Sequence, residues 1–253
     1  MFIVQNARSE PRNGVNTLIQ CNGRGKEVLK LENTDKVIVR FTDQASAFHN
    51  VKRAIIPGKG AVINAIATHV FEILEQNGIK THFIKKLNNC EQLCHEVKAI
   101  PLNVVVRNVA SGSMAKRLGV KEGYTPALPV FEIYYKNSEL GDPLINEDHA
   151  LALNLLRPDE LVKIREQALK INEILKPFFA EIDITLVDFK IEFGRHSNGD
   201  LLLADEISPD ESRLWDMKTG EQLDKDQFSR DLGDVKEAYE KILKKLVAKE
   251  RTN

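Results

Sequence analysis

The sequence has few cysteines, no long apolar run and almost no net charge, and each absence excludes a class of protein. Three cysteines in 253 residues cannot form the disulfide framework of a secreted domain, which indicates a reducing cytosol. No apolar run approaches the roughly 20 residues that span a bilayer, and no basic segment leads into an apolar one as in a secretory signal. A formal net charge of −1 gives no global field that attracts nucleic acid or an acidic membrane surface. We therefore expect a cytoplasmic protein without nucleic-acid or membrane partners.

One short segment gathers residues that often bind metals. Cys90, Cys94 and His95 lie close together, but their spacing matches no zinc pattern and no second ligand pair follows at a usual distance. We interpret these cysteines as buried or half-buried thiols.

Hydrophobic patterning predicts an α+β protein with two lobes that share a cleft. The apolar fraction of 42% is ordinary for a soluble globular protein with a substantial core. Alternating segments indicate a mostly antiparallel N-terminal layer, interrupted by a helical stripe that ends at Gly78. The expected strands are 16–21, 26–31, 36–41, 81–87, 93–98 and 102–107, and the expected helix is 61–77. Strand character ends near Asn108, so we predict a β-rich lobe over 1–107 and a mixed lobe over 108–253.

The second lobe is predicted to contain a hairpin centred on Asn198-Gly199, the dipeptide typical of two-residue turns. The other expected elements are a short helix that follows Ser111-Gly112-Ser113 and is closed by Gly119, a strand at 130–136, and helices at 146–156, 159–179 and 234–249. A two-residue turn places Glu192 directly opposite Asp205, with Asp188 and Lys190 on the same face as Glu192. Like charges in that position repel. Either a cation such as Mg²⁺ lies between them or both are solvated on an exposed face, and this stretch alone leaves both readings open.

Two further segments suit phosphate groups. The turn Asn22-Gly23-Arg24-Gly25-Lys26 can place backbone N–H groups and two cations over a polyphosphate, or it is simply a hairpin with a basic edge. Arg107 ends a strand just before Ser113, near a helix start. This pattern fits a phosphate monoester, or else an N-cap serine beside a surface arginine.

Arg213 lies in a segment that we expect to be an irregular loop held by Pro209 and Trp215, where a guanidinium could bind an anion through two hydrogen bonds. A second polar loop contains His149, which is a candidate base or a structural histidine. Taken together, these elements predict a polyanion site compatible with phosphoryl transfer from ATP.

Six motifs in order then point to a known family. They are GKGAVINAI from Gly58, PLNVVVRNVASGS from Pro101, YYKN from Tyr134, GDPLINEDH from Gly141, LVDFKIEFG from Leu186 and LLLADEISPDESRLWD from Leu201. On these motifs, over about 23–248, the chain resembles the phosphoribosylaminoimidazole-succinocarboxamide synthases (SAICAR synthetases) of purine biosynthesis, in their short bacterial form. These enzymes condense carboxyaminoimidazole ribotide (CAIR) with L-aspartate and convert ATP to ADP and phosphate.

The resemblance implies a role for each candidate residue. It implies an ATP-binding lobe similar to those of protein kinases and ATP-grasp enzymes, with Mg²⁺ as cofactor, and we expect a homo-oligomer, a dimer. Lys190, Glu192 and Asp205 resemble the catalytic group, and the two carboxylates resemble the Mg²⁺ ligands. The residues expected at ATP are Arg24, Gly25, Lys26, Val97, Lys98 and Ala99; those expected at the ribotide phosphate are Arg107, Ser113 and Arg213. Lys136, Asp142 and Glu147 are candidates for the amino-acid side.

The chain departs from the family pattern at two positions. The usual Gly-Lys-Ala-Lys hairpin is Gly-Arg-Gly-Lys here, so Arg24 presents a planar fork instead of a compact ammonium group. His49 replaces an aspartate after Ser46-Ala47-Phe48, and we expect it to shape a loop near the substrate. Two alternatives to a ligase are a small-molecule kinase of similar architecture and a nucleotide-binding module without catalysis, although Lys190, Glu192 and Asp205 argue against the module.

Overall fold

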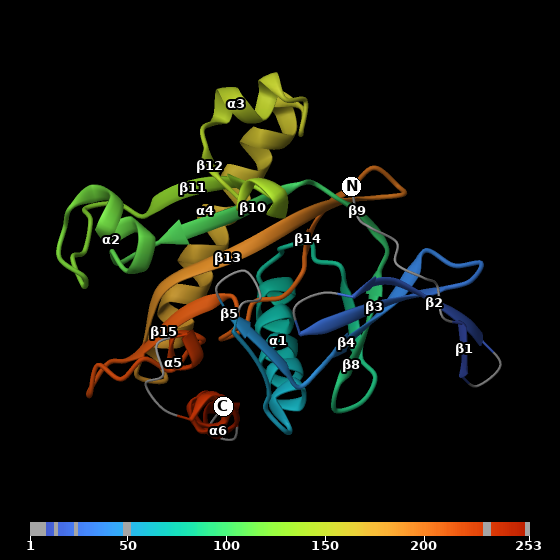
Figure 1. Ribbon diagram of the computed structural model, residues 1–253, viewed down its shortest axis with the longest axis horizontal. Helices are drawn as coiled ribbons and strands as arrows, with labels where there is room; N and C mark the ends of the chain where they lie inside the picture. The colour runs from blue at the N-terminus through green and yellow to red at the C-terminus, as the bar shows by residue number, and fades with distance from the viewer. Residues whose placement is uncertain (1–8, 13–14, 23–24, 48–51, 230–233, 251–253) are drawn as a thin grey trace.

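The computed structural model describes residues 9–12, 15–22, 25–47, 52–229 and 234–250 (Figure 1). Arg24 and His49 lie outside these ranges. The predicted contact of Arg24 with ATP phosphates and the predicted loop of His49 near the substrate therefore fall outside the described residues. No helix in the described part of the chain is long and apolar enough to cross a membrane.

The N-terminal sheet has six antiparallel strands. Their order across the sheet is β1 (Ser9–Arg12), β2 (Val15–Asn22), β3 (Lys26–Leu31), β4 (Lys36–Phe41), β8 (Glu91–His95) and β7 (Phe83–Lys86). β4 alternates as a half-buried strand should, with Val37, Val39 and Phe41 facing the core. A small two-stranded sheet of β5 (Gln44–Ala47) and β6 (Lys52–Ile55) follows. The three predicted strands at 16–21, 26–31 and 36–41 are thus confirmed.

Helix α1 (Lys59–Gln76) covers one face of this sheet and also packs against the closing helix α6 (Val235–Glu250). Ile66, Val70 and Leu74 on its apolar stripe are fully buried, and burying each contributes roughly 1.5–3 kcal/mol relative to exposure. The helix ends as predicted, because Gly78 has φ +78° and Ile79 N–H donates to Leu74 O. At its start, a Cβ on Gly60 would lie 2.6 Å from the Phe41 carbonyl oxygen, so only glycine allows this close approach to β4.

The second sheet is organised around β13 (Ile184–His196), the long strand that crosses the centre of Figure 1. The strand order is β12 (Leu144–Ile145), β11 (Val130–Tyr135), β10 (Leu102–Arg107), β13 and β14 (Leu201–Ala204). Two more strands, β9 (Val97–Ala99) and β15 (Ser212–Asp216), also pair with β13. The side of β13 with Phe189, Ile191 and Phe193 is buried in the core, and α4 (Pro158–Ala180) packs against the strand. The opposite side carries Asp188, Lys190 and Glu192, as the alternation predicted.

Four short helical segments complete the described fold. They are α2 (Gly112–Leu118), a 3₁₀ turn (Ser138–Leu140), α3 (Glu147–Ala152) and α5 (Asp226–Ser229). α3 is shorter than the predicted helix at 146–156, and it is followed at Asn154 by a residue with φ +51°. The α+β class is confirmed by this mixture of antiparallel sheets and helices.

The sheets divide earlier in the chain than the predicted lobe boundary. The segment 102–107 forms a strand as expected, but β10 pairs with β11 and β13 and does not join the N-terminal layer. The chain passes from the first sheet to the second between His95 and Val97. The division into lobes at 107 and 108 therefore stays a prediction, since the strands themselves change sheet before it.

The predicted hairpin register is wrong by one residue. Glu192 pairs with Ala204 and not with Asp205, because the turn has three residues. Its ends are joined by the bond from His196 N–H to Asp200 O at 2.9 Å, and Gly199 adopts φ +90°. A one-residue shift alone would place Asp205 on the other face of the sheet. Asp205 follows the end of β14 with φ +66°, however, and its carboxylate still reaches Lys190 on the predicted face.

Candidate active site

A mostly buried lysine from β13 lies among three carboxylates. Lys190 Nζ is 3.1 Å from Glu192 Oε1, 3.2 Å from Asp205 Oδ2 and 3.1 Å from Glu211 Oε2. Glu192 shares its strand and its face, while Asp205 and Glu211 come from the segment between β14 and β15. The three predicted catalytic residues are therefore in one cluster, although the register that led to this prediction was wrong.

Two further lysines bring the other lobe and β11 into the same cluster. Lys26, the first residue of β3, pairs with Asp205 and lies 2.8 Å from Glu206 Oε1, while Lys136, just after β11, pairs with Glu192. Three ammonium groups thus face four carboxylates, which leaves one negative charge in excess. We call this set of seven side chains, Lys26, Lys136, Lys190, Glu192, Asp205, Glu206 and Glu211, the lysine–carboxylate cluster.

The charged groups of the cluster shift one another's pKa values. Burial opposes ionisation of Asp205, but the ammonium groups of Lys26 and Lys190 outweigh it and hold the pKa of Asp205 well below its usual value. Burial would likewise lower the pKa of Lys190, but Glu211, Asp205 and Glu192 raise it well above the ordinary lysine value. Glu206 differs: burial and the nearby Asp205 raise its pKa despite Lys26, and its Oε2 atom is buried without a hydrogen-bond partner in the described structure.

Lys59, at the start of α1, is a buried lysine outside the cluster, and it lies beside the glycine-rich turn that contains Gly25. Lys59 Nζ donates to Gln44 O at 3.1 Å and pairs with Asp210, whose other oxygen accepts from the Tyr239 hydroxyl at 2.6 Å. A Cβ on Gly25 would lie 3.6 Å from Lys59 Nζ, so this ammonium group is next to the turn expected to bind ATP phosphates. The GKG motif was recognised in the sequence, but nothing in its spacing indicated that Lys59 is turned inward.

Arg107, Ser113 and Arg213 also lie close together, and Asp188 pairs with both arginines. The strand register places Arg107 on β10 and Arg213 on β15 opposite Asp188 from its two sides. Arg107 Nη1 is 2.6 Å and Arg213 Nη1 is 2.9 Å from Asp188 Oδ2, and Arg107 Nη2 lies 3.4 Å from Ser113 Oγ. Glu132 accepts from Arg107 at 2.6 Å. The carboxylates fix the orientation of both guanidinium groups, a role that the sequence did not reveal.

Two details of this group differ from expectation. Arg213 lies on a regular strand, β15, and not in an irregular loop. The N-cap of α2 is Ser111, whose side chain makes no capping bond, so the N-cap explanation does not account for Ser113.

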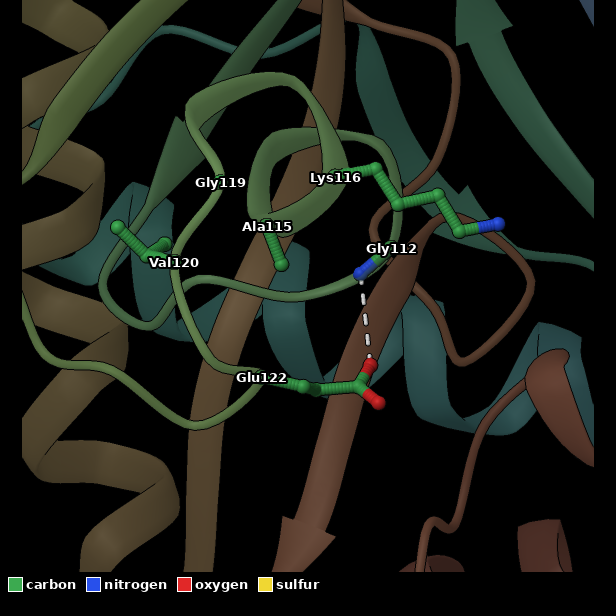
Figure 2. Close-up of a pocket in the computed structure, with 6 residues that line it drawn as sticks. All are labelled: Gly112, Ala115, Lys116, Gly119, Val120 and Glu122. Carbon is green, nitrogen blue, oxygen red and sulfur yellow. Dashed lines mark hydrogen bonds between the residues drawn. The ribbon is translucent and has the colours of Figure 1, made fainter.

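A cavity of about 380 Å³ lies beside α2, lined by Gly112, Ala115, Lys116, Gly119, Val120 and Glu122 (Figure 2). Within it, the Glu122 carboxylate accepts from Gly112 N–H at 3.4 Å, and Gly112 also packs against the Arg213 guanidinium.

The remaining predicted residues are more scattered. Val97–Ala99 form β9 and pair with residues 194–196 of β13, where a Cβ on Gly194 would lie 2.5 Å from Val97 Cγ2. Glu147 pairs with Arg165 of α4 and shares no described contact with the cluster. Asp142 is in a turn with φ +50°. His149 accepts from Asn146 N–H in a capping box, which favours its structural reading. The roles in binding of Val97–Ala99, Asp142 and Glu147 stay predictions.

Comparison with known proteins finds relatives that match this chain in sequence and in fold. The family described as SAICAR synthetase covers residues 20–246. The phosphoribosylaminoimidazole-succinocarboxamide synthase of Fusobacterium nucleatum is 53% identical over 227 residues, which is 90% of this chain and 96% of the relative. The crystal structure of the Ehrlichia chaffeensis enzyme of that name superposes with a TM-score of 0.88 at 44% identity, covering 91% of this chain and 98% of the other. A SAICAR synthetase in complex with ADP gives 0.87 at 47% identity, covering 90% and 97%. This chain belongs to the SAICAR synthetase family.

Proposed function

We infer that this chain is an ATP-dependent carbon–nitrogen ligase that condenses CAIR with L-aspartate to give SAICAR, ADP and phosphate in purine biosynthesis. The observation that carries the assignment is the lysine–carboxylate cluster on the same face of β13 as the paired guanidinium groups of Arg107 and Arg213. The first suits a polyphosphate and its metal, and the second suits a phosphate monoester. The relative with bound ADP supports the use of ATP.

We propose that Glu192 and Asp205 hold Mg²⁺, and that Glu206 and Glu211 add negative charge in the same cluster. The donor set fits this ion, because Mg²⁺ prefers oxygen ligands and the cluster carries one more carboxylate than ammonium groups. The buried, unpartnered Oε2 atom of Glu206 is a further oxygen available to a cation. When bound, Mg²⁺ would offset charge on the ATP phosphates.

The reaction needs an activated carboxyl group, because the CAIR carboxylate is a poor electrophile. One of its oxygens attacks the γ-phosphorus of ATP as the bond to ADP breaks, and the product is an acyl phosphate. The aspartate amine then attacks the acyl carbon, phosphate leaves with the shared oxygen, and the amine loses a proton. Lys190 and Lys26 stabilise the negative charge on the transferred phosphoryl group, since both stay protonated at working pH.

The other residues have positioning roles in this proposal. Arg107, Ser113 and Arg213 bind the ribotide phosphate, while Gly25, Lys26 and Arg24 bind the ATP phosphates and Val97, Lys98 and Ala99 lie beside adenine. Lys136, which pairs with Glu192 in the cluster, contacts a carboxylate of the amino acid in this proposal. Asp142 and Glu147 remain candidates for that side, and a homodimer remains the expected assembly.

Dependence of ADP release on the amine tests the ligase assignment. With ATP, Mg²⁺ and CAIR present, we expect omission of L-aspartate to reduce ADP release to near background, because the acyl phosphate is protected from water until an amine arrives. L-Asparagine in place of L-aspartate is the matched control, since it supplies an amine without the second carboxylate. ADP release at the full rate without any amine would indicate a small-molecule kinase instead.

A further inference from the structure

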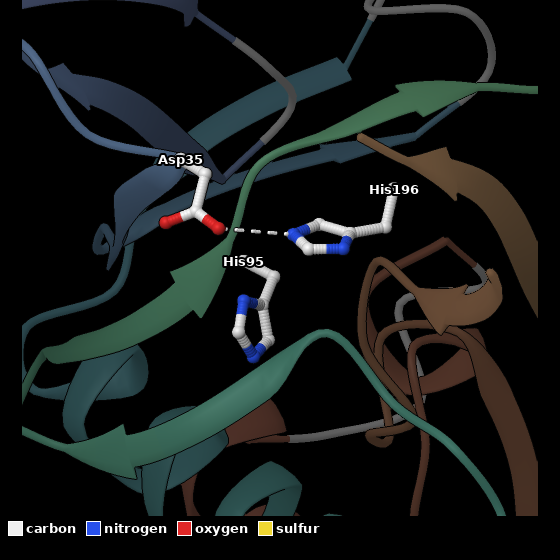
Figure 3. A group of neighbouring side chains, drawn as sticks. All are labelled: Asp35, His95 and His196. Atoms are coloured by element: carbon white, nitrogen blue, oxygen red, sulfur yellow. Dashed lines mark hydrogen bonds and ion pairs between the residues drawn. The ribbon is translucent and has the colours of Figure 1, made fainter. Parts of the chain in front are cut away.

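Two histidines and an aspartate from separate parts of the chain meet where the two sheets adjoin (Figure 3). Asp35 precedes β4, His95 ends β8 and His196 ends β13. One possible ligand atom from each residue lies within 4.8 Å of the other two. His196 Nε2 is 3.3 Å from Asp35 Oδ2, and the centroids of the two imidazole rings are 4.8 Å apart. None of the three belongs to the lysine–carboxylate cluster or to the arginine group.

Backbone hydrogen bonds fix all three residues in position. His95 N–H donates to His82 O and Glu96 N–H donates to Asp35 O, both at 2.7 Å, while His196 N–H donates to Asp200 O at 2.9 Å. His196 is also the register partner of Val97. The cluster is therefore held by strand pairing, and binding a ligand there costs little backbone ordering.

The polar atoms of the cluster are incompletely satisfied by the protein. The His196 side chain is only 9% exposed, and the buried Nδ1 atom of His95 has no hydrogen-bond partner among the described residues. A buried imidazole nitrogen without a partner is destabilising, because folding removes its hydrogen bond to water without replacing it. Asp35 is 49% exposed, so solvent and small ions reach the group from its side. A ligand that accepts the imidazole lone pairs would remove this cost.

We propose that Asp35, His95 and His196 bind a divalent transition-metal cation of the Zn²⁺ class, with water completing the coordination. Two imidazoles and one carboxylate suit Zn²⁺, Co²⁺ or Ni²⁺, whereas Mg²⁺ and Ca²⁺ require oxygen ligands. Ligand atoms around one Zn²⁺ lie roughly 3.3 Å apart, given metal–nitrogen bonds of about 2 Å. The pair of His196 and Asp35 already has this separation, and the 4.8 Å limit leaves movements of about 1 Å for the exposed aspartate and the His95 ring.

The neighbouring cysteine does not belong to this site. Cys94 alternates with His95 along β8, so its side chain points to the other face, where it is fully buried in the core. Burial raises the pKa of the Cys94 thiol far above its usual value, which disfavours the thiolate that a metal requires. The partners of His95 are distant in the sequence, and no spacing pattern could indicate them.

The proposed ion would join the two sheets beside β9. His95 belongs to the N-terminal sheet, Asp35 lies in the turn that leads into β4 of that sheet, and His196 belongs to β13. Binding to the folded state alone stabilises it by mass action, so the cation is expected to raise the unfolding temperature. This inference does not depend on the proposed function, because it concerns different residues and a different class of ion.

Co²⁺ provides the direct test, because its visible absorption bands report the ligand set. The full chain is titrated with Co²⁺ in excess Mg²⁺, which competes with Co²⁺ for sites made of carboxylates alone. We expect one equivalent to bind, without the near-ultraviolet band of thiolate ligation, and Zn²⁺ to compete. His95→Gln and His196→Gln should each weaken binding tenfold or more, on the order of the loss of one ligand, whereas His69→Gln on α1 should leave it unchanged.

Thermal unfolding gives a second readout. Zn²⁺ should raise the unfolding temperature of the parent and of His69→Gln, but not that of His196→Gln. Asp35 lies in an exposed turn, so Asp35→Asn should fold even if a histidine variant does not. This variant should also weaken Co²⁺ binding. Binding that is unchanged in Asp35→Asn and in the folded histidine variants, a thiolate band, or no binding by the parent would each overturn the proposal.

Discussion

Replacing Asp205 with Asn is expected to lower turnover about 10²- to 10³-fold, the range seen when one preorganised charge is removed from a transition state. The carboxylate contacts Lys26 and Lys190 and is a proposed ligand of Mg²⁺. Asparagine keeps the size but cannot supply the charge. Steady-state ADP release at saturating ATP, CAIR and L-aspartate measures the effect, and the Mg²⁺ concentration for half-maximal activity should rise as well.

The fold should tolerate this substitution for two reasons. Asn accepts the left-handed backbone conformation of Asp205 (φ +66°) as readily as Asp does. In addition, the cluster changes from four carboxylates against three ammonium groups to three against three. The unfolding temperature should therefore stay near that of the parent. Asp200→Asn is the matched control, because Asp200 lies in the turn of the same hairpin and pairs only with surface groups in the described structure. Near-normal turnover in Asp205→Asn would refute the metal assignment.

Arg213→Lys is expected to raise the KM for CAIR about 10- to 100-fold while changing kcat little. A hydrogen bond to a charged group contributes roughly 1.5–3 kcal/mol, and about 1.4 kcal/mol corresponds to tenfold in affinity. Lysine keeps the charge but not the planar fork that Asp188 and Asp226 orient. Initial rates with CAIR varied at saturating ATP and L-aspartate measure the change.

Arg195→Lys provides the same substitution elsewhere on the sheet. Arg195 is on β13 and pairs with Glu160 of α4, away from Asp188. The KM of the Arg195→Lys variant for CAIR should therefore match that of the parent. If Arg213→Lys raised the KM for ATP as much as that for CAIR, the ribotide assignment would be wrong and a general distortion of the cleft would explain the result.

The sequence predicted best those features that depend on local periodicity. Alternation along 184–196 is a property of the strand itself, so the sides of β13 that carry Phe189 and Lys190 followed directly from the residue order. The hairpin register did not follow, because Asn-Gly occurs in loops of two or three residues and only the bond between His196 and Asp200 distinguishes them. That the three predicted catalytic residues still converge depends on the left-handed Asp205, a conformation that strand patterning does not reveal.

Features that depend on which strands become neighbours could not be predicted. Arg107 and Arg213 were predicted to bind an anion, but Asp188 orients them only because β10 and β15 flank β13. Glu206 and Glu211 lie inside a recognised motif, yet the pairing of Glu206 with Lys26 needs the first sheet to be in place, and the pairing of Glu211 with Lys190 needs β15 beside β13. The membership of β10 in the second sheet has the same origin, since an apolar strand shows no preference for a partner in its sequence.

The strand pairing of β13 also constrains the order of folding. The pairs β2–β3, β3–β4 and β13–β14 join segments that are close in sequence, so they can form early, whereas β13 pairs with β9 and β10 from far earlier in the chain. Long-range pairings pay their loop-closure entropy before they gain contact energy and are therefore slow. Lys26 and Lys136 reach the carboxylates around Lys190 only when β3 and β11 are in place, so we expect a newly synthesised chain to complete its charged centre in the late, slow phase of folding. Recovery of activity during refolding should then follow the formation of this sheet.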